Sequence, residues 1–314
     1  MKRVFLLLIT LAVFSGIPAC KPNKKAATQD QDGKINVTTT IFPPYDFVRQ
    51  IAGDMVNLTM LLPPGSESHS FEPSPKDIIT IQNSGIFIYA GGESDKWIDR
   101  ILQSINMDSM KILALLDAVD PVEEEIVEGM EEEEDEDETV YDEHVWTSPQ
   151  NAILIVEAIT ELLCETDPFN ADFFRGNAAA YIEELKQLDG AFEEVVSAAN
   201  RDTVVFADRF PFRYFADVYG LNYFAAFPGC STETEPSAAT VAFLINKIRA
   251  DQIPVVFHIE LSNERMANTI SGETGAKKLL LHSAHNINKR DFESGLGYLD
   301  IMKANIETLR EALN

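Results

Sequence analysis

Short strand-like runs alternate with helical segments along most of this chain, and the alternation limits the folds that it can adopt. Runs rich in β-branched and aromatic residues occupy 35–41, 55–62 and 85–92, with helical patterns between them. Such β-α-β alternation predicts a parallel sheet covered by helices on both faces. Residues 111–119 continue the amphipathic pattern of 97–105, so we expect helix there as well.

The same alternation returns after residue 201. Residues 148–168 predict a helix that Ser148 caps and Pro149 begins, and 170–200 predict a connecting helix that is long for a globular protein. The predicted fold class is therefore α/β, with two lobes, 35–169 and 201–314, that contain parallel-type sheets and are bridged by one long rigid helix. Ligands of such sheets bind at the carboxyl ends of the strands, so we expect a cleft between the lobes.

The N-terminus has the pattern of an export signal. Lys2 and Arg3 precede an apolar stretch at 4–14 that is too short to span a membrane, and small residues then lead to Cys20. Residues 1–20 resemble a bacterial lipoprotein signal, which implies that Cys20 is lipidated and anchors the chain at the membrane, on the periplasmic side or at the cell surface. An ordinary secretory signal cut nearby is the alternative. The polar segment that follows, up to residue 34, predicts a flexible tether.

Charge excludes one class of partner. The net charge of -26 argues against nucleic acid as a ligand, because phosphate binding needs basic grooves. Roughly half of the acidic excess lies in residues 122–143, which interrupt the first lobe as an insertion. This run is either simply solvated or a weak collector of cations beside the cleft.

The chain has five histidines, and three of them lie where predicted strands end or a helix begins. His69 follows a strand in a loop rich in Pro and Gly, His144 precedes the helix cap, and His282 closes an apolar strand. For His258 and His285, packing or hydrogen bonding within the fold is the stronger interpretation. Imidazoles on loops of both lobes favour coordination of zinc or another first-row metal, and added carboxylates favour manganese. Cys164 and Cys230 form no metal motif, and whether they pair is open.

Several motifs resemble the metal-specific solute-binding proteins of ABC importers, the zinc and manganese type (cluster A-I). PPGSESHSFEPSP and DEHVWTSP resemble the two histidine motifs of this family, and FRYFADVYGL, VVFHIELSNERMANTISGETGAKKLLL and the closing helix resemble later segments. The resemblance covers almost the whole mature chain. It implies a bilobal fold, a divalent metal held between the lobes, an ABC permease as partner and no catalysed reaction.

The resemblance also implies ligands. His69 and His144 match the first two metal ligands, and the fourth falls on His282. The third falls on Arg209, which cannot bind a cation because it is permanently charged and has no lone pair. Asp208, Glu260 or water could complete the coordination, and Arg209 could instead pair with Glu235 or Glu260. Nitrogen in place of oxygen at the fourth position favours Zn2+ over Mn2+ as the bound ion.

Other functions compete with zinc delivery to a permease. A manganese receptor of the same class is one. Three histidines with an open position also describe the catalytic zinc of an exported hydrolase, although no general base lies beside a ligand in the sequence. A role in adhesion is the third.

Overall fold

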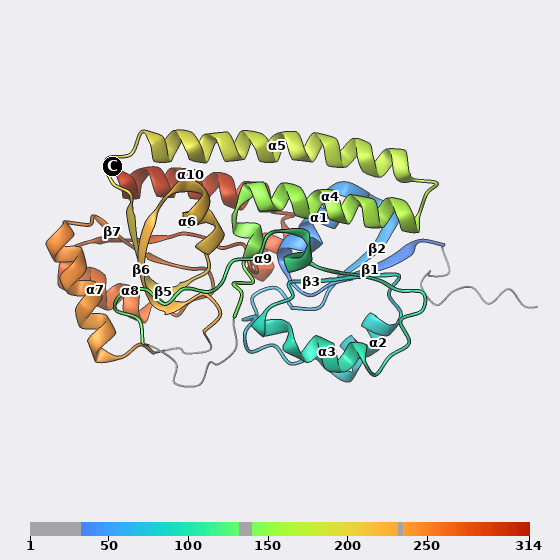
Figure 1. Ribbon diagram of the computed structural model, residues 1–314, viewed down its shortest axis with the longest axis horizontal. Coiled ribbons are helices and arrows are strands. Elements are labelled where there is room, and N and C mark those ends of the chain that lie inside the picture. The colour runs from blue at the N-terminus through green and yellow to red at the C-terminus, as the bar shows by residue number, and fades with distance from the viewer. Residues whose placement is uncertain (1–32, 132–139, 232–234) are drawn as a thin grey trace, which may run out of the picture.

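The structure is a computed structural model that describes residues 33–131, 140–231 and 235–314. Figure 1 shows two α/β lobes side by side, with the long helix α5 (Ala171–Ser197) lying along both. The predicted signal 1–20 with Cys20, most of the tether 21–34 and residues 132–139 of the acidic insertion lie outside the described residues. Within the part of the chain that is described, no helix is long and apolar enough to cross a membrane.

The first lobe contains a four-stranded parallel sheet in the order β2-β1-β3-β4. Its strands are β1 (Ile35–Thr39), β2 (Val56–Met60), β3 (Ile86–Tyr89) and β4 (Lys111–Ala114), and its helices are α1 (Phe42–Ala52), α2 (Pro75–Gln82) and α3 (Lys96–Leu102). The helix expected at 111–119 is wrong, because its first four residues form β4 and pair with β3. A short apolar run fits a buried strand as well as a helix, and here the neighbouring strand decides.

The second lobe repeats this arrangement, with a parallel sheet in the order β6-β5-β7-β8. The strands are β5 (Thr203–Phe210), β6 (Asn222–Pro228), β7 (Val255–His258) and β8 (Lys277–Leu280). The helices are α6 (Arg213–Tyr219), α7 (Ala238–Asp251), α8 (Arg265–Thr274), α9 (Lys289–Glu293) and α10 (Tyr298–Leu313). The two matching parallel sheets confirm the predicted α/β class with two lobes.

One long helix bridges the lobes, and the helix before it packs against it and against the first lobe. The helix α4 (Pro149–Thr166) begins as predicted, since the Ser148 side chain accepts a hydrogen bond from the Asn151 backbone N–H and Pro149 occupies the first turn. The helix α5 (Ala171–Ser197) runs for 27 residues and continues through Gly190. It packs against α4 and α10, which provide the tertiary contacts that a helix of this length needs.

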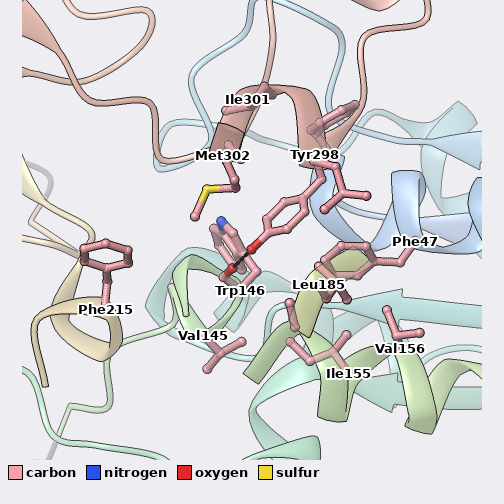
Figure 2. Close-up of a cluster of buried hydrophobic side chains, with 14 of the residues drawn as sticks. Phe47, Val145, Trp146, Ile155, Val156, Leu185, Phe215, Tyr298, Ile301 and Met302 are labelled. Carbon is pink, nitrogen blue, oxygen red and sulfur yellow. Dashed lines mark hydrogen bonds between the residues drawn. The ribbon is translucent and has the colours of Figure 1, made fainter. Parts of the chain in front are cut away.

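Buried aromatic residues join the lobes at the centre of the molecule (Figure 2). The Trp146 indole N–H donates a 2.9 Å hydrogen bond to the Ser283 carbonyl, and the Tyr298 hydroxyl donates one of 2.7 Å to the Trp146 carbonyl. The Tyr298 backbone N–H donates to the Asp46 carboxylate at 2.7 Å. Trp146 and Tyr298 are fully buried. One continuous hydrophobic core therefore contains residues of both lobes.

Substituting Tyr298→Phe removes the hydroxyl that contacts the Trp146 carbonyl. We expect the free energy of unfolding to fall by about 1–2 kcal/mol, because a buried acceptor loses its partner. Tyr181→Phe is the matched control, since the buried Tyr181 hydroxyl has no hydrogen-bond partner among the described residues. That control should leave the stability unchanged or raise it. Chemical denaturation of the three proteins measures both effects, and equal stability of the parent and Tyr298→Phe would contradict the role of this hydrogen bond.

Candidate metal centre

A cavity of about 60 Å³ lies between the lobes, where strands of both sheets end. The loop after β2 contributes His69 to its wall, and His144 follows the acidic insertion. From the second lobe come residues at the end of β5 and in the loops after β7 and β8. Parallel sheets bind ligands at the carboxyl ends of their strands, and here the two lobes share one cavity at those ends.

Three imidazole rings meet at this cavity, and we call His69, His144 and His285 the histidine cluster. The ring centroids lie 5.8 Å apart for His69 and His144, 5.4 Å for His69 and His285, and 5.2 Å for His144 and His285. One donor atom of each ring, together with a Glu143 carboxylate oxygen, lies within 4.8 Å of the others. This spacing suits a single metal ion.

Each ring of the cluster has a polar partner at Nδ1. The His144 Nδ1 lies 2.9 Å from an Asp142 carboxylate oxygen, and the His285 Nδ1 lies 3.4 Å from the Ser68 hydroxyl. The His69 Nδ1 lies 3.4 Å from the Ser94 hydroxyl. Metal-binding histidines commonly use one ring nitrogen for an orienting hydrogen bond and the other for the metal. The arrangement leaves three Nε2 atoms for an ion.

Glu143 supplies the fourth donor atom of this group, although its side chain does not line the 60 Å³ cavity. Its side chain is buried and accepts hydrogen bonds from the backbone N–H of Ser94, at 3.0 Å, and from the Ser94 hydroxyl. One of its oxygens lies 4.0 Å from the His69 Nδ1, on the side of the ring that also faces Ser94. Glu143 therefore places negative charge next to His69 and holds the loop that contains Ser94.

The structure brings His69 and His144 together as predicted, but it adds His285 and not His282. The strand β8 ends at Leu280, and the His282 Nδ1 accepts a 3.0 Å hydrogen bond from the Ala284 backbone N–H. The backbone of His282 is bound on both sides by the Asn305 side chain. His282 thus turns into its own loop, while the residue three positions later reaches the cavity.

Glu260 explains why His285 reaches the cavity. Its carboxylate accepts hydrogen bonds from the Ser283 backbone N–H at 2.8 Å, the Ser283 hydroxyl at 2.6 Å and the His285 backbone N–H at 3.0 Å. Both carboxylate oxygens are thereby used to shape the loop after β8. Glu260, expected as a possible ligand, thus shapes a loop instead, and His285 was not predicted because nothing in the sequence spacing shows which way this loop turns.

Charge distinguishes the three rings. Burial lowers the pKa of His69 to about 4, with the charge of Glu143 opposing it and those of His144 and Arg209 adding to it. Burial also lowers the pKa of His285 well below its ordinary value. Burial acts in the same direction on His144, but the neighbouring Asp142 outweighs it, so the pKa of His144 is raised. The rings of His69 and His285 are thus neutral at neutral pH, whereas at His144 a metal ion must compete with a proton.

Arg209 lies in the cavity wall at the end of β5. Its Nε donates to the Ser231 carbonyl, and its Nη1 lies 3.6 Å from a Glu67 carboxylate oxygen. Of the two carboxylates considered as partners of Arg209, Glu235 pairs with Arg265 and Glu260 holds the loop after β8. The neighbouring Asp208 has one buried oxygen without a hydrogen-bond partner among the described residues.

The described ends of the acidic insertion lie against the second lobe. The Glu124 carboxylate accepts a 2.7 Å hydrogen bond from the Cys230 backbone N–H, and Glu125 contacts Arg213 at 2.8 Å. The Tyr214 hydroxyl donates to the Asp142 carbonyl at 2.8 Å. Cys230 and Cys164 are both free thiols, so the structure contains no bond between them. The insertion therefore places Asp142, and with it His144, against both lobes.

Comparisons with known proteins find relatives whose names refer to zinc. The family model "zinc-uptake complex component A, periplasmic" (ZnuA) matches residues 37–312. The high-affinity zinc uptake system protein ZnuA of Bacillus subtilis is 31% identical over 98% of this chain and 97% of its own length. The zinc-binding lipoprotein AdcA of Streptococcus pneumoniae is 34% identical over 99% of this chain, which spans only 61% of that relative.

Solved structures give the same result. The Zn(II)-bound ZnuA-like domain of Streptococcus pneumoniae AdcA aligns with a TM-score of 0.74 and 33% identity, over 90% of this chain and 99% of that domain. The metal-dependent lipoprotein YcdH of Bacillus subtilis aligns with a TM-score of 0.76 and 30% identity, over 90% of this chain and 100% of its own.

Substituting Asp142→Asn tests the support of His144. A divalent metal needs neutral imidazole, so the affinity of the parent should fall about tenfold per pH unit below the raised pKa of His144. Without the Asp142 charge this fall should begin at lower pH. At pH 8 the affinity itself should drop about 10–100-fold, because the ring loses its orienting partner.

Zinc titrations of both proteins between pH 5 and pH 8 measure the two effects. Asp54→Asn, a change at an exposed carboxylate, is the control and should follow the parent at every pH. Identical pH profiles for the parent and Asp142→Asn would show that the 2.9 Å contact has no influence on the site.

Proposed function

The chain belongs to the zinc-uptake complex component A (ZnuA) family, and from this we propose that it captures a zinc ion outside the cytoplasm and delivers it to an ABC permease for uptake. The observation that carries the proposal is the buried histidine cluster at the cavity between the lobes, with a polar partner at each Nδ1. The family consists of solute-binding components rather than enzymes, so the hydrolase alternative has no support.

The proposed ligands are the Nε2 atoms of His69, His144 and His285. The Asp142 contact to His144 is the carboxylate–histidine arrangement that is common at zinc sites. Three nitrogen ligands favour zinc, whereas manganese prefers a shell rich in oxygen. A manganese receptor of the same class is the second candidate, and it is favoured by the carboxylates of Asp208 and Glu67 in the cavity wall.

The histidine substitutions distinguish the proposed set from the one expected from the sequence. His285→Ala should weaken zinc binding by more than about 100-fold, since it removes a ligand rather than a supporting group. His282→Ala is the matched control and should stay within about threefold of the parent, because its ring faces its own loop. Competition with a zinc chelator gives both affinities, and metal analysis gives the stoichiometry. A strong loss in His282→Ala with little change in His285→Ala would reverse the assignment.

The proposed membrane attachment rests on Cys20. The resemblance of residues 1–20 to a lipoprotein signal and the lipoprotein relatives support a lipid anchor there. Replacing Cys20→Ala in a bacterial host should move the chain from the membrane fraction to the soluble extracytoplasmic fraction, because the anchor is lost. Cys164→Ala serves as the control and should remain with the membrane. If the Cys20 variant also remains there, the anchor is not a lipid on this residue.

A further inference from the structure

Among the described residues, one lysine or arginine side chain lines the metal cavity, that of Arg209. The pairing of β5 with β6 shifts by one residue just before it, between Phe206 and Arg209. Such a β-bulge changes the direction of the side chains that follow, and bulges are common beside binding sites. The side chain of Arg209 is buried, in the wall of the cavity at which the histidine cluster meets.

Contacts to both lobes hold the guanidinium at this position. Its Nε donates to the Ser231 carbonyl in the second lobe. Its Nη1 lies 3.6 Å from a carboxylate oxygen of Glu67, on the loop of the first lobe that contains His69. Glu67 pairs with it from the margin of the cavity, where 43% of the Glu67 side chain is exposed. The positive charge therefore stays beside the groups that would bind an ion.

A metal dication in this cavity is repelled by the guanidinium. The cavity of about 60 Å³ holds an ion and few water-sized groups besides, so a charge in its wall lies close to the ion. Repulsion between buried charges is stronger than in water and is screened little by salt. The charge also acts on the rings, since after burial it is one of the causes that lower the pKa of His69 and of His285. Of the four converging donor atoms, only the Glu143 oxygen carries a negative charge that opposes this repulsion.

We propose that Arg209 sets the zinc affinity of this site by electrostatic repulsion, and thereby keeps the bound ion releasable. Arg209 tunes the site and is not a ligand, because a guanidinium has no lone pair to offer. This inference rests on the proposed capture and delivery of zinc. A receptor that hands its ion on needs a fast release step, and affinity at a given site is adjusted mainly through the rate of dissociation.

A clamp between the lobes is the competing role for Arg209, because its pair with Glu67 joins the two lobes at the cavity. The two roles predict opposite effects when the charge is removed. Loss of a clamp would loosen the cavity and weaken zinc binding. Loss of the repulsion would tighten it.

The test measures two properties of the purified protein with zinc alone as the ligand. Competition with a chelator gives the affinity, and stopped-flow mixing of the loaded protein with excess chelator gives the release rate. We expect Arg209→Met to bind zinc about tenfold tighter than the parent or more, because a positive charge near a dication is removed. Most of this gain should appear as slower release of the ion.

Further variants separate the charge of Arg209 from its shape. Arg209→Lys keeps the charge without the planar fork, so it should bind zinc at least about fivefold more weakly than Arg209→Met. Arg209→Gln is neutral and should follow Arg209→Met. Arg265→Met is the control for loss of a positive charge at the surface, where Arg265 pairs with Glu235, and it should match the parent. Thermal unfolding of the metal-free proteins establishes that each variant is folded.

Three results would overturn the inference and leave the proposed zinc binding in place. If Arg209→Met binds zinc with the affinity of the parent, the guanidinium charge has no influence on the ion. If it binds zinc more weakly, Arg209 is a clamp. If Arg209→Lys tightens binding as much as Arg209→Met does, shape rather than charge sets the affinity. A parent protein that binds no zinc would remove the proposed function, and the inference with it.

Discussion

Trp146 determines where the two halves of the metal centre lie relative to one another. Its backbone follows His144, its indole N–H is bound by the Ser283 carbonyl, and its own carbonyl is bound by Tyr298. Ser283 begins the turn that presents His285. A single buried side chain thus links a ligand loop of the first lobe to one of the second, and Tyr298, the first residue of α10, completes the link. The Trp146 ring also packs edge-on against the rings of His144 and His285, with centroids 5.4 and 4.9 Å away, so loss of Trp146 would disturb both imidazoles directly.

Much of the fold could be predicted from local signals. Ser148 and Pro149 mark the start of α4 by chemistry that acts within one turn, and the apolar spacing through Gly190 was enough to predict α5. The strand β4 was missed because its identity depends on the pairing with β3, which is remote in sequence. Local propensity predicts secondary structure well where a cap or a long apolar repeat determines it. It predicts poorly where pairing with a neighbouring strand determines it.

Less of the metal centre could be predicted, because it too depends on contacts between residues that are remote in sequence. His69 and His144 lie in motifs that the family resemblance identified. The choice between His282 and His285 depends on the left-handed backbone of Ala284, at φ 61°, and on three hydrogen bonds to Glu260, which lies 23 to 25 residues away. No spacing rule contains that information. Ser68 could likewise not be predicted as the partner of His285, since that contact forms only when loops of both lobes meet.

The continuous core that runs through both lobes has a consequence for how the protein responds to its ion. Residues on either side of the cavity share one apolar interior, with α5 and α10 packed against each other along it. An ion bound only by the folded chain therefore stabilises the residues of both lobes that share this core. The loaded receptor is then sturdier as a whole than the empty one, and a cell that is short of metal would carry a population of this protein that is easier to degrade.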